Sequence, residues 1–168
     1  MQLIGRINRR KIYYLQVRNN PGWINSLPRN YWIAFTIANQ EDEELVPPAV
    51  KSCLDKNVSY TCSAGNLGSW TEQYFDEEIS FRAIDYEQQT KKEFDYELSP
   101  VTTSHKNFGE GFWFATTLAY DDNFKFDKVV CIDFTSRKVK NHLIELIEKI
   151  NNGWLPSDEE TVHAEYDN

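Results

Sequence analysis

One stretch of this chain has the residue types and the position of an anion site: the turn Gly65-Asn66-Leu67-Gly68-Ser69, between a predicted strand and a predicted helix. In doubly wound α/β sheets such a turn binds anions, because the helix N-terminus offers free N–H donors and a partial positive charge. The turn lacks the third glycine of G-x-G-x-x-G, the Lys-Ser/Thr pair of a P-loop and a nearby basic residue. We therefore favour a turn that needs glycine for its backbone, with an anion site as the alternative.

His105 is the histidine best placed for catalysis, because it precedes a predicted helix and lies close in sequence to Glu110. A histidine beside a carboxylate can act as a general base. No G-x-S-x-G motif supplies a nucleophile, and Ser63, Ser104 and Cys62 lack a sequence context that would activate them. We predict that His105 is not catalytic and that it hydrogen-bonds near the start of the following helix.

The sequence predicts neither a metal site nor a cofactor. His142 lies beside an apolar helical stripe and His163 in the polar tail, and no acidic stretch has the spacing of a calcium-binding loop. The three cysteines form no C-x-x-C pair; they are Cys53, Cys62 and Cys131. Their odd number and apolar surroundings favour buried, reduced thiols in a cytosolic protein.

Charge divides the chain more sharply than any motif. The first 38 residues carry six Lys or Arg and no Asp or Glu, which leaves 12 basic and 26 acidic residues for the other 130. The formal net charge of −8 disfavours nucleic acid as a partner, because phosphate binding needs a basic surface. The early arginines could form a local anion site, but pairing with acidic residues of the same fold is the favoured interpretation.

Hydrophobic patterns predict five strands and four helices. Residues 31–37 and 128–135 are apolar on both faces, as in buried parallel strands, and residues 58–64 alternate with a period of two. Residues 11–17 and 101–103 are further strands. One helix begins near Pro47-Pro48, one at a Ser69–Glu72 capping box, one at an Asn107–Glu110 cap, and the last covers residues 137–150.

This alternation of strands and helices predicts an α/β fold with a central, mostly parallel sheet and helices on both faces. We expect a single domain over residues 1–154 and an acidic tail over residues 155–168. Residues 85–100 have no clear period and are predicted to form an exposed excursion. The N-terminus lacks the apolar segment of a signal peptide, and no run approaches the roughly 18 apolar residues of a membrane span, so we expect a soluble, cytoplasmic protein.

Part of the chain, roughly residues 30–135, resembles an uncharacterised bacterial family, a domain of unknown function. Its members carry a Trp-Gly…Trp-Asp pattern, followed by Thr-Thr-Trp-His, a few acidic residues and Trp-Phe. The chain matches these motifs at Gly65, Trp70, Thr102, Thr103, His105, Glu110, Trp113 and Phe114, and it departs from them at Ala64, Thr71 and Ser104. The resemblance implies the fold and a bacterial origin, and it implies no activity.

The composition is also similar to that of small acidic immunity proteins, with which bacteria block their own secreted toxins, as in contact-dependent growth inhibition. Nuclease toxins are basic because they bind phosphate backbones, so an acidic face with aromatic anchors would speed and select their binding. We expect a non-enzymatic protein that binds such a basic partner through Glu41, Asp42, Glu43, Glu44, Trp70, Tyr74, Asp76, Glu77, Glu78, Asp85, Tyr86 and Glu87. The alternative is a nucleotide-binding or hydrolytic enzyme that uses the Gly65–Ser69 turn and His105.

Overall fold

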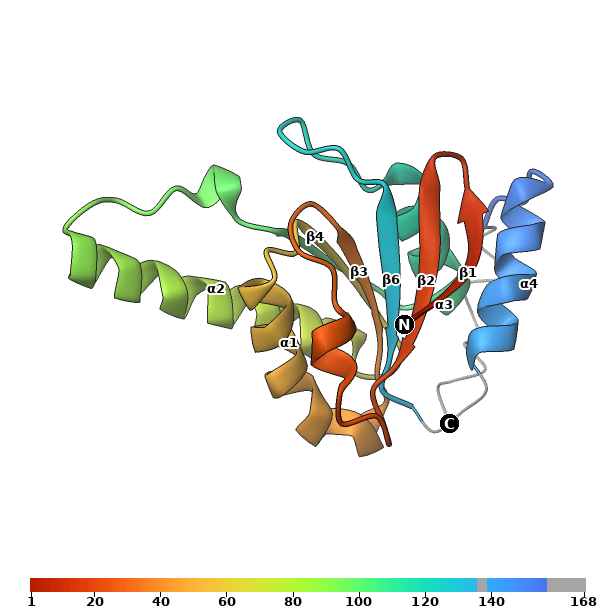
Figure 1. Ribbon diagram of the computed structural model, residues 1–168, viewed down its shortest axis with the longest axis horizontal. Coiled ribbons are helices and arrows are strands. Elements are labelled where there is room, and N and C mark those ends of the chain that lie inside the picture. Colours follow the sequence, from red (N-terminus) through yellow and green to blue (C-terminus); the bar gives the residue numbers. More distant parts are fainter. Residues whose placement is uncertain (136–138, 157–168) are drawn as a thin grey trace.

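The strand β6 (Lys128–Asp133) lies inside a six-stranded sheet although it comes last among the strands in sequence. The structure is a computed structural model that describes residues 1–135 and 139–156. Across the sheet the order is β1 (Gln2–Ile7), β2 (Arg10–Gln16), β6, β3 (Ile33–Ile37), β4 (Tyr60–Ala64) and β5 (Val101–His105). Within these described residues β1–β2 is the single antiparallel pair and the other four pairs are parallel, so the predicted mostly parallel sheet is confirmed (Figure 1).

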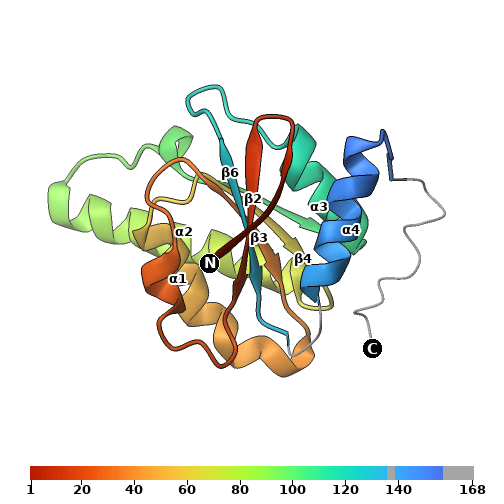
Figure 2. The same cartoon turned by 45° about the vertical axis from the view of Figure 1, so that its right-hand side comes forward.

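Helices cover both faces of the sheet, as Figures 1 and 2 show. One face carries the short turn η1 (Trp23–Ser26), α1 (Val46–Asp55) and α2 (Gly68–Thr90). The other face carries α3 (Phe108–Trp113), the π-helical turn η4 (Phe114–Leu118) and α4 (Val139–Asn151). Every residue of β3 and β4 is buried, because both layers pack against these strands. The predicted α/β fold with helices on both faces is therefore confirmed.

Local sequence signals located most of the elements. α1 begins at Val46 with prolines in its first turn, as predicted. At the start of α3 the side chain of Asn107 accepts a hydrogen bond from the backbone N–H of Glu110 at 2.9 Å, so the predicted cap is confirmed. β1 was not predicted; its outer position and exposed residues give it no clear apolar pattern.

α2 differs from the prediction at both ends. It begins at Gly68, so Ser69 lies inside the helix and the predicted capping box with Glu72 is wrong. Instead, the hydroxyl of Ser104 donates to the Glu72 carboxylate at 2.5 Å. The helix continues to Thr90, which overturns the predicted excursion for residues 85–90. Its distal half extends beyond the sheet (Figure 1), and a segment with the turn η3 (Tyr96–Leu98) returns from its tip to β5.

Three predictions fall on parts of the chain outside the described residues. They are the start of the last helix near residue 137, the position of His163 and most of the acidic tail. The described part of that helix is α4, which buries Val139, Leu143, Leu146 and Ile147 against the sheet.

Gly65 connects β4 to α2 at a point where no side chain fits. Its φ is +89°, and a Cβ atom there would lie 2.5 Å from the backbone oxygen of Ala38, at the end of the neighbouring β3. Gly22 offers a matched control, because its φ is −96° and a Cβ there would meet nothing within 4 Å.

We expect Gly65→Ala to lower the free energy of unfolding by about 2–3 kcal/mol, because the backbone strain and the clash with Ala38 both act on the folded state. Gly22→Ala should change it by less than about 1 kcal/mol. Urea unfolding of the two variants measures the difference. Equal stabilities would show that the β4–α2 turn does not need glycine.

Candidate functional site

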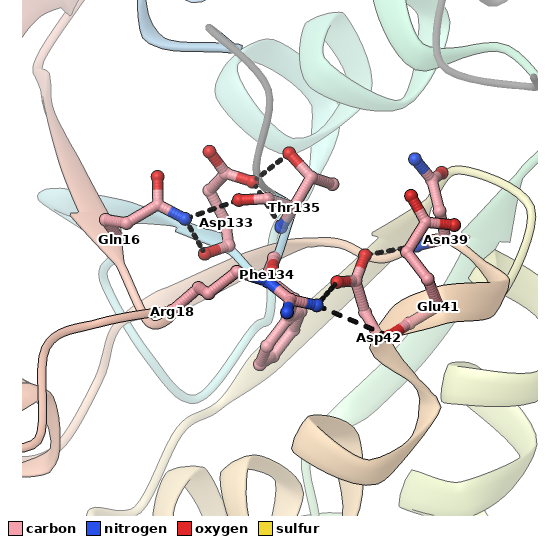
Figure 3. Close-up of polar contacts among 8 residues, drawn as sticks. All are labelled: Gln16, Arg18, Asn39, Glu41, Asp42, Asp133, Phe134 and Thr135. Atoms are coloured by element: carbon pink, nitrogen blue, oxygen red, sulfur yellow. Dashed lines mark hydrogen bonds and ion pairs between the residues drawn. The ribbon is translucent and has the colours of Figure 1, made fainter.

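Polar side chains gather where β2, β6 and β3 end, in the region that Figure 3 enlarges. The element that follows β3 leads to α1 on one face, whereas α4, after β6, lies on the other face. In open α/β sheets ligands bind at such a switch between faces, outside the carboxyl ends of the strands. This edge of the sheet therefore has the position of a ligand site.

Asp133 is the centre of one half of this cluster. Its carboxylate is fully buried and accepts hydrogen bonds from the Tyr14 hydroxyl at 2.7 Å and from the backbone N–H and the hydroxyl of Thr135 at 2.8 and 2.7 Å. The side-chain amide of Gln16 donates to the backbone oxygens of Asp133 and Thr135 at 3.1 and 2.6 Å. These contacts join the ends of β2 and β6.

Arg18 and Asp42 form the other half. Asp42 lies in the turn η2 (Gln40–Leu45) and is fully buried. One of its carboxylate oxygens accepts a hydrogen bond from the Arg18 guanidinium at 2.5 Å, and the other accepts one from the backbone N–H of Asn39 at 3.0 Å. Arg18 also donates to the backbone oxygens of Phe134 and Glu41. The expected pairing of an early arginine with an acidic residue of the same fold is confirmed here. The guanidinium joins β2, β6 and the start of η2.

Burial raises the pKa of Asp133 to about 6, and repulsion from Asp42 adds to this, while the hydrogen bonds from Tyr14 and Thr135 oppose it. A carboxyl group with this pKa can exchange a proton near neutral pH, which is what general acid–base catalysis requires. Both oxygens of Asp133 are nevertheless held by donors of the same chain. The cluster therefore joins strand ends. Among the described residues the amide nitrogen of the buried Asn39 has no hydrogen-bond partner.

The sequence analysis missed this cluster. The available signal was an aspartate directly after the apolar run Val129–Ile132, because a carboxylate at the end of a buried strand lies at the edge where α/β sheets bind ligands. Gln16, Arg18 and Asn39 carry no such signal, because only the strand order brings them to Asp133.

The turn at Gly65 and His105 do lie together. Gly65, Asn66, Ser69, His105 and Lys106 line an open pocket of about 380 Å³ at the carboxyl ends of β4 and β5. The sequence shows no basic residue near the turn, but the fold brings one there, because Lys106 lines the same pocket. A lysine and the start of α2 are groups that suit an anion.

His105 itself is poorly placed for catalysis in this pocket. Its Nδ1 lies 3.9 Å from a Glu110 oxygen, and its Nε2 is buried without a hydrogen-bond partner in residues 1–135 and 139–156. Burial lowers the pKa of His105, and the carboxylates of Glu110 and Glu72 only partly oppose this. Among the described residues no hydrogen bond joins His105 to a hydroxyl group. The neighbouring hydroxyl of Ser104 donates to the Glu72 carboxylate instead.

Metal-binding residues are not grouped in the part of the chain that the structure describes: no three His, Cys, Asp or Glu side chains there could hold an ion together. The three cysteines are buried and unpaired. Burial raises the pKa of the Cys62 thiol to about 12, so it is protonated at neutral pH.

The acidic residues predicted to bind a partner do not form one face. Asp42 is buried against Arg18, so its assignment to a binding surface is wrong. Glu41, Glu43 and Glu44 are on η2 at the carboxyl end of the sheet, and both Figures 1 and 2 place this turn far from the tip of α2. The remaining predicted residues all lie on α2.

Two of the predicted carboxylates on α2 have structural contacts. Glu78 is largely buried and pairs with Arg82 at 3.1 Å and with Lys51 of α1 at 3.9 Å. Asp76 accepts a hydrogen bond from the Thr102 hydroxyl of β5 at 2.6 Å. These contacts hold α2 against α1 and β5, so reversing either charge would disturb the fold as well as the surface.

The other predicted residues of α2 are more accessible. Trp70 and Tyr74 are half-buried, with ring centroids 5.6 Å apart, and pack against the core under α1 and α2. Glu77 is exposed, and within the described part of the chain its carboxylate accepts a hydrogen bond from Gln73 alone. In the distal half Asp85, Tyr86 and Glu87 are exposed.

α2 carries two apolar stripes, and the sheet uses one of them. Thr71, Phe75, Ile79 and Ala83 repeat every four residues and are buried. Trp70, Tyr74, Phe81 and Ile84 lie on the other side of the helix at intervals of four, seven and three residues, with Glu77 at the intermediate position, and we call these four residues the outer stripe. The side chains of Phe81 and Ile84 are 62% and 49% exposed.

Residues 12–150 match the family DUF7684, which is described as a domain of unknown function. The chain belongs to this family. The DUF7684 match extends from the start of β2 to the last turn of α4, so it includes the whole sheet except β1 and the first residues of β2. The expected membership of an uncharacterised domain family is confirmed; the individual motifs and the likeness to immunity proteins stay predictions. No curated protein and no solved structure matches the chain significantly. None of the described helices is both long and apolar enough to span a membrane.

The raised pKa of Asp133 predicts a pH dependence of stability. Because the folded state favours the protonated carboxyl, the free energy of unfolding falls as pH rises from the ordinary value of 3.8 through about 6. Relative to Asp133→Asn, the natural chain should lose about 2 kcal/mol between pH 4 and pH 7, because at pH 4 the unfolded carboxyl is already partly ionised. Urea unfolding of both proteins at pH 4, 5, 6 and 7 measures this. Parallel pH profiles would contradict it.

Proposed function

We propose that the chain is a non-enzymatic binding protein that binds a basic protein through the outer stripe of α2 and the carboxylates beside it. The observation that carries the proposal is the exposure of Phe81 and Ile84 on a helix that extends beyond the sheet. Large apolar side chains that no part of the fold covers mark interaction surfaces, and aromatic residues are favoured as anchors there.

Charge supports a basic partner over a second copy of the chain. From Asp76 to Leu98 the sequence has eight acidic and three basic residues. Two such helices would repel each other, whereas a basic surface would be attracted and steered. Glu77 and Asp85 flank the exposed part of the outer stripe and are not in any ion pair among the described residues.

The partner that fits best is a nuclease-type toxin domain, and the chain would then be an immunity protein of the bacterial cytoplasm. Support comes from the acidic composition together with an acidic helix that bears aromatic side chains. A nuclease needs a basic surface for its own substrate, so an inhibitor that presents carboxylates and rings there would bind quickly and block the active site. The partner to test first is a toxin domain encoded beside this chain, co-expressed with it in a growth-protection assay.

The alternative, a nucleotide-binding or hydrolytic enzyme, has one observation in its favour. Gly65, Ser69, His105 and Lys106 line one pocket. The proposal of a binding protein is preferred because, among the described residues, the Nε2 of His105 is buried and has no hydrogen-bond partner that it could activate as a nucleophile. A His105→Ala variant that folds normally yet no longer protects cells would favour the enzyme.

Removing the anchors tests the outer stripe. Phe81→Ser with Ile84→Ser should raise the dissociation rate of the toxin complex at least about tenfold, because interface anchors mainly slow dissociation. The stability of the free chain should change by less than about 0.5 kcal/mol, since both side chains are exposed. The matched control is Leu3→Ser with Leu155→Ser, which removes equally exposed side chains outside α2. Biolayer interferometry measures the rates; equal rates for the two double variants would contradict the proposal.

Reversing the flanking charges tests the electrostatic part. Glu77→Lys with Asp85→Lys should slow association about tenfold at 50 mM salt, and the effect should shrink at 500 mM salt because screening shortens the field. Glu145→Lys with Glu148→Lys makes the same charge change on α4, across the sheet, and should have a small effect. An association rate that changes neither with salt nor with the charge reversal at Glu77 and Asp85 would show that the acidic helix is only a solvated surface.

A further inference from the structure

An open groove of about 870 Å³ lies at the amino ends of β4 and β5, apart from the outer stripe of α2. Its walls are formed by residues of η4 and the loop that follows, and by the segment that enters β5. This loop projects above the sheet in Figure 1. Tyr60 and Phe114 in the groove belong to the core under α3 and α4, so the groove is on the face of the sheet opposite to α2.

The floor of the groove is apolar and aromatic. The rings of Tyr60 and Phe114 lie 6.2 Å apart and are tilted by 49°. Beside them Leu118 and Tyr120 are 49% and 71% exposed, and Val101 is exposed at the start of β5. Aliphatic chains pack on such a floor, and ring faces attract cations.

Carboxylates line the same groove. They belong to Glu97, Asp121 and Asp122, and among the described residues that line the groove none is basic. Within the described residues none of the three is in an ion pair. Asp121 also accepts a hydrogen bond from the backbone N–H of Asn123 at 2.7 Å, which shapes the loop. The groove thus offers negative charge without an internal partner, next to uncovered apolar surface.

We propose that this groove binds an arginine side chain of a basic partner protein. The aliphatic stem lies on Leu118 and Val101, and the guanidinium lies among the ring faces and the carboxylates. Arginine fits better than lysine, because its planar, weakly hydrated guanidinium stacks on rings and binds carboxylates through paired hydrogen bonds. The identity of the partner rests on the proposed function, whereas the arginine site stands on the groove alone.

A peptide pair isolates the charge. The probe is a short acetylated and amidated peptide with two arginines, and its control carries citrulline at both positions, which keeps the shape and removes the charge. The whole chain should bind the arginine peptide at least about tenfold more tightly than the citrulline peptide, because only the former pairs with carboxylates and ring faces. Calorimetry measures the affinity. Amide NMR shifts should locate the contact at Val101, Leu118 and Asp122.

Variants then separate this groove from a general acidic surface. Asp121→Asn with Asp122→Asn keeps the acceptor for Asn123 and should weaken arginine-peptide binding about tenfold. Glu41→Gln with Glu44→Gln makes the same change in net charge at the opposite end of the sheet and should leave binding within about twofold. Leu118→Ser should weaken it by a smaller factor of about three, through lost contact with the stem.

The outcomes distinguish this site from the proposed function. Equal affinity for the arginine and citrulline peptides would overturn the arginine site. An equal loss of affinity in the Asp121/Asp122 and the Glu41/Glu44 variants would overturn it as well. Amide NMR shifts confined to α2 would also overturn the arginine site, and they would leave the outer stripe as the binding surface. If the peptide binds in the groove but the toxin complex dissociates at the same rate after the Phe81 and Ile84 changes, the arginine site is kept and the role of α2 is refuted.

Discussion

The insertion of β6 between β2 and β3 is the constraint on which the rest of the structure depends. β2 and β3 are neighbours in sequence but do not pair; each pairs instead with β6, which comes about 90 residues after β3. Alternate residues of β6 enter opposite cores, Val129 and Cys131 under α3 and α4, Val130 and Ile132 under α1 and α2. Because a parallel sheet must be covered on both faces, both helical layers are built around this one strand.

The polar cluster at the carboxyl ends strengthens the same junction. Asp133 of β6 is held by Tyr14 of β2, while Arg18, just after β2, holds Asp42 of η2 and the backbone after β6. Removing one partner of a buried ion pair leaves an uncompensated charge, so these residues depend on one another. A position where many α/β sheets bind ligands is here occupied mainly by contacts between strand ends.

α2 is the element in which fold and surface diverge. Its inner stripe packs on the sheet, and its contacts with α1 and β5 include Glu78 with Lys51 and Asp76 with Thr102. The distal half has no sheet to cover, and the ring of Phe94 packs against Tyr86 and Tyr96, which attaches the returning segment to the helix. These contacts therefore hold in place the elements that carry the exposed part of the outer stripe and the groove on the opposite face of the sheet. Both carry carboxylates beside apolar surface, a combination that suits basic protein partners.

Elements whose signals are local could be predicted from the sequence. The double-sided apolar runs at 31–37 and 128–135 identified buried strands, because burial on both faces removes polar alternation, and the Asn107 cap needs only four consecutive residues. Tertiary structure alone decided the strand order, the burial of Asp42 and the surroundings of Asp133, because these depend on pairing between distant segments. The length of α2 was not predicted, and the reason is physical. Apolar residues on two opposite sides of a helix cancel its 3.6-residue period, so the stripe that packs inward and the stripe left exposed can be separated only once the sheet is in place.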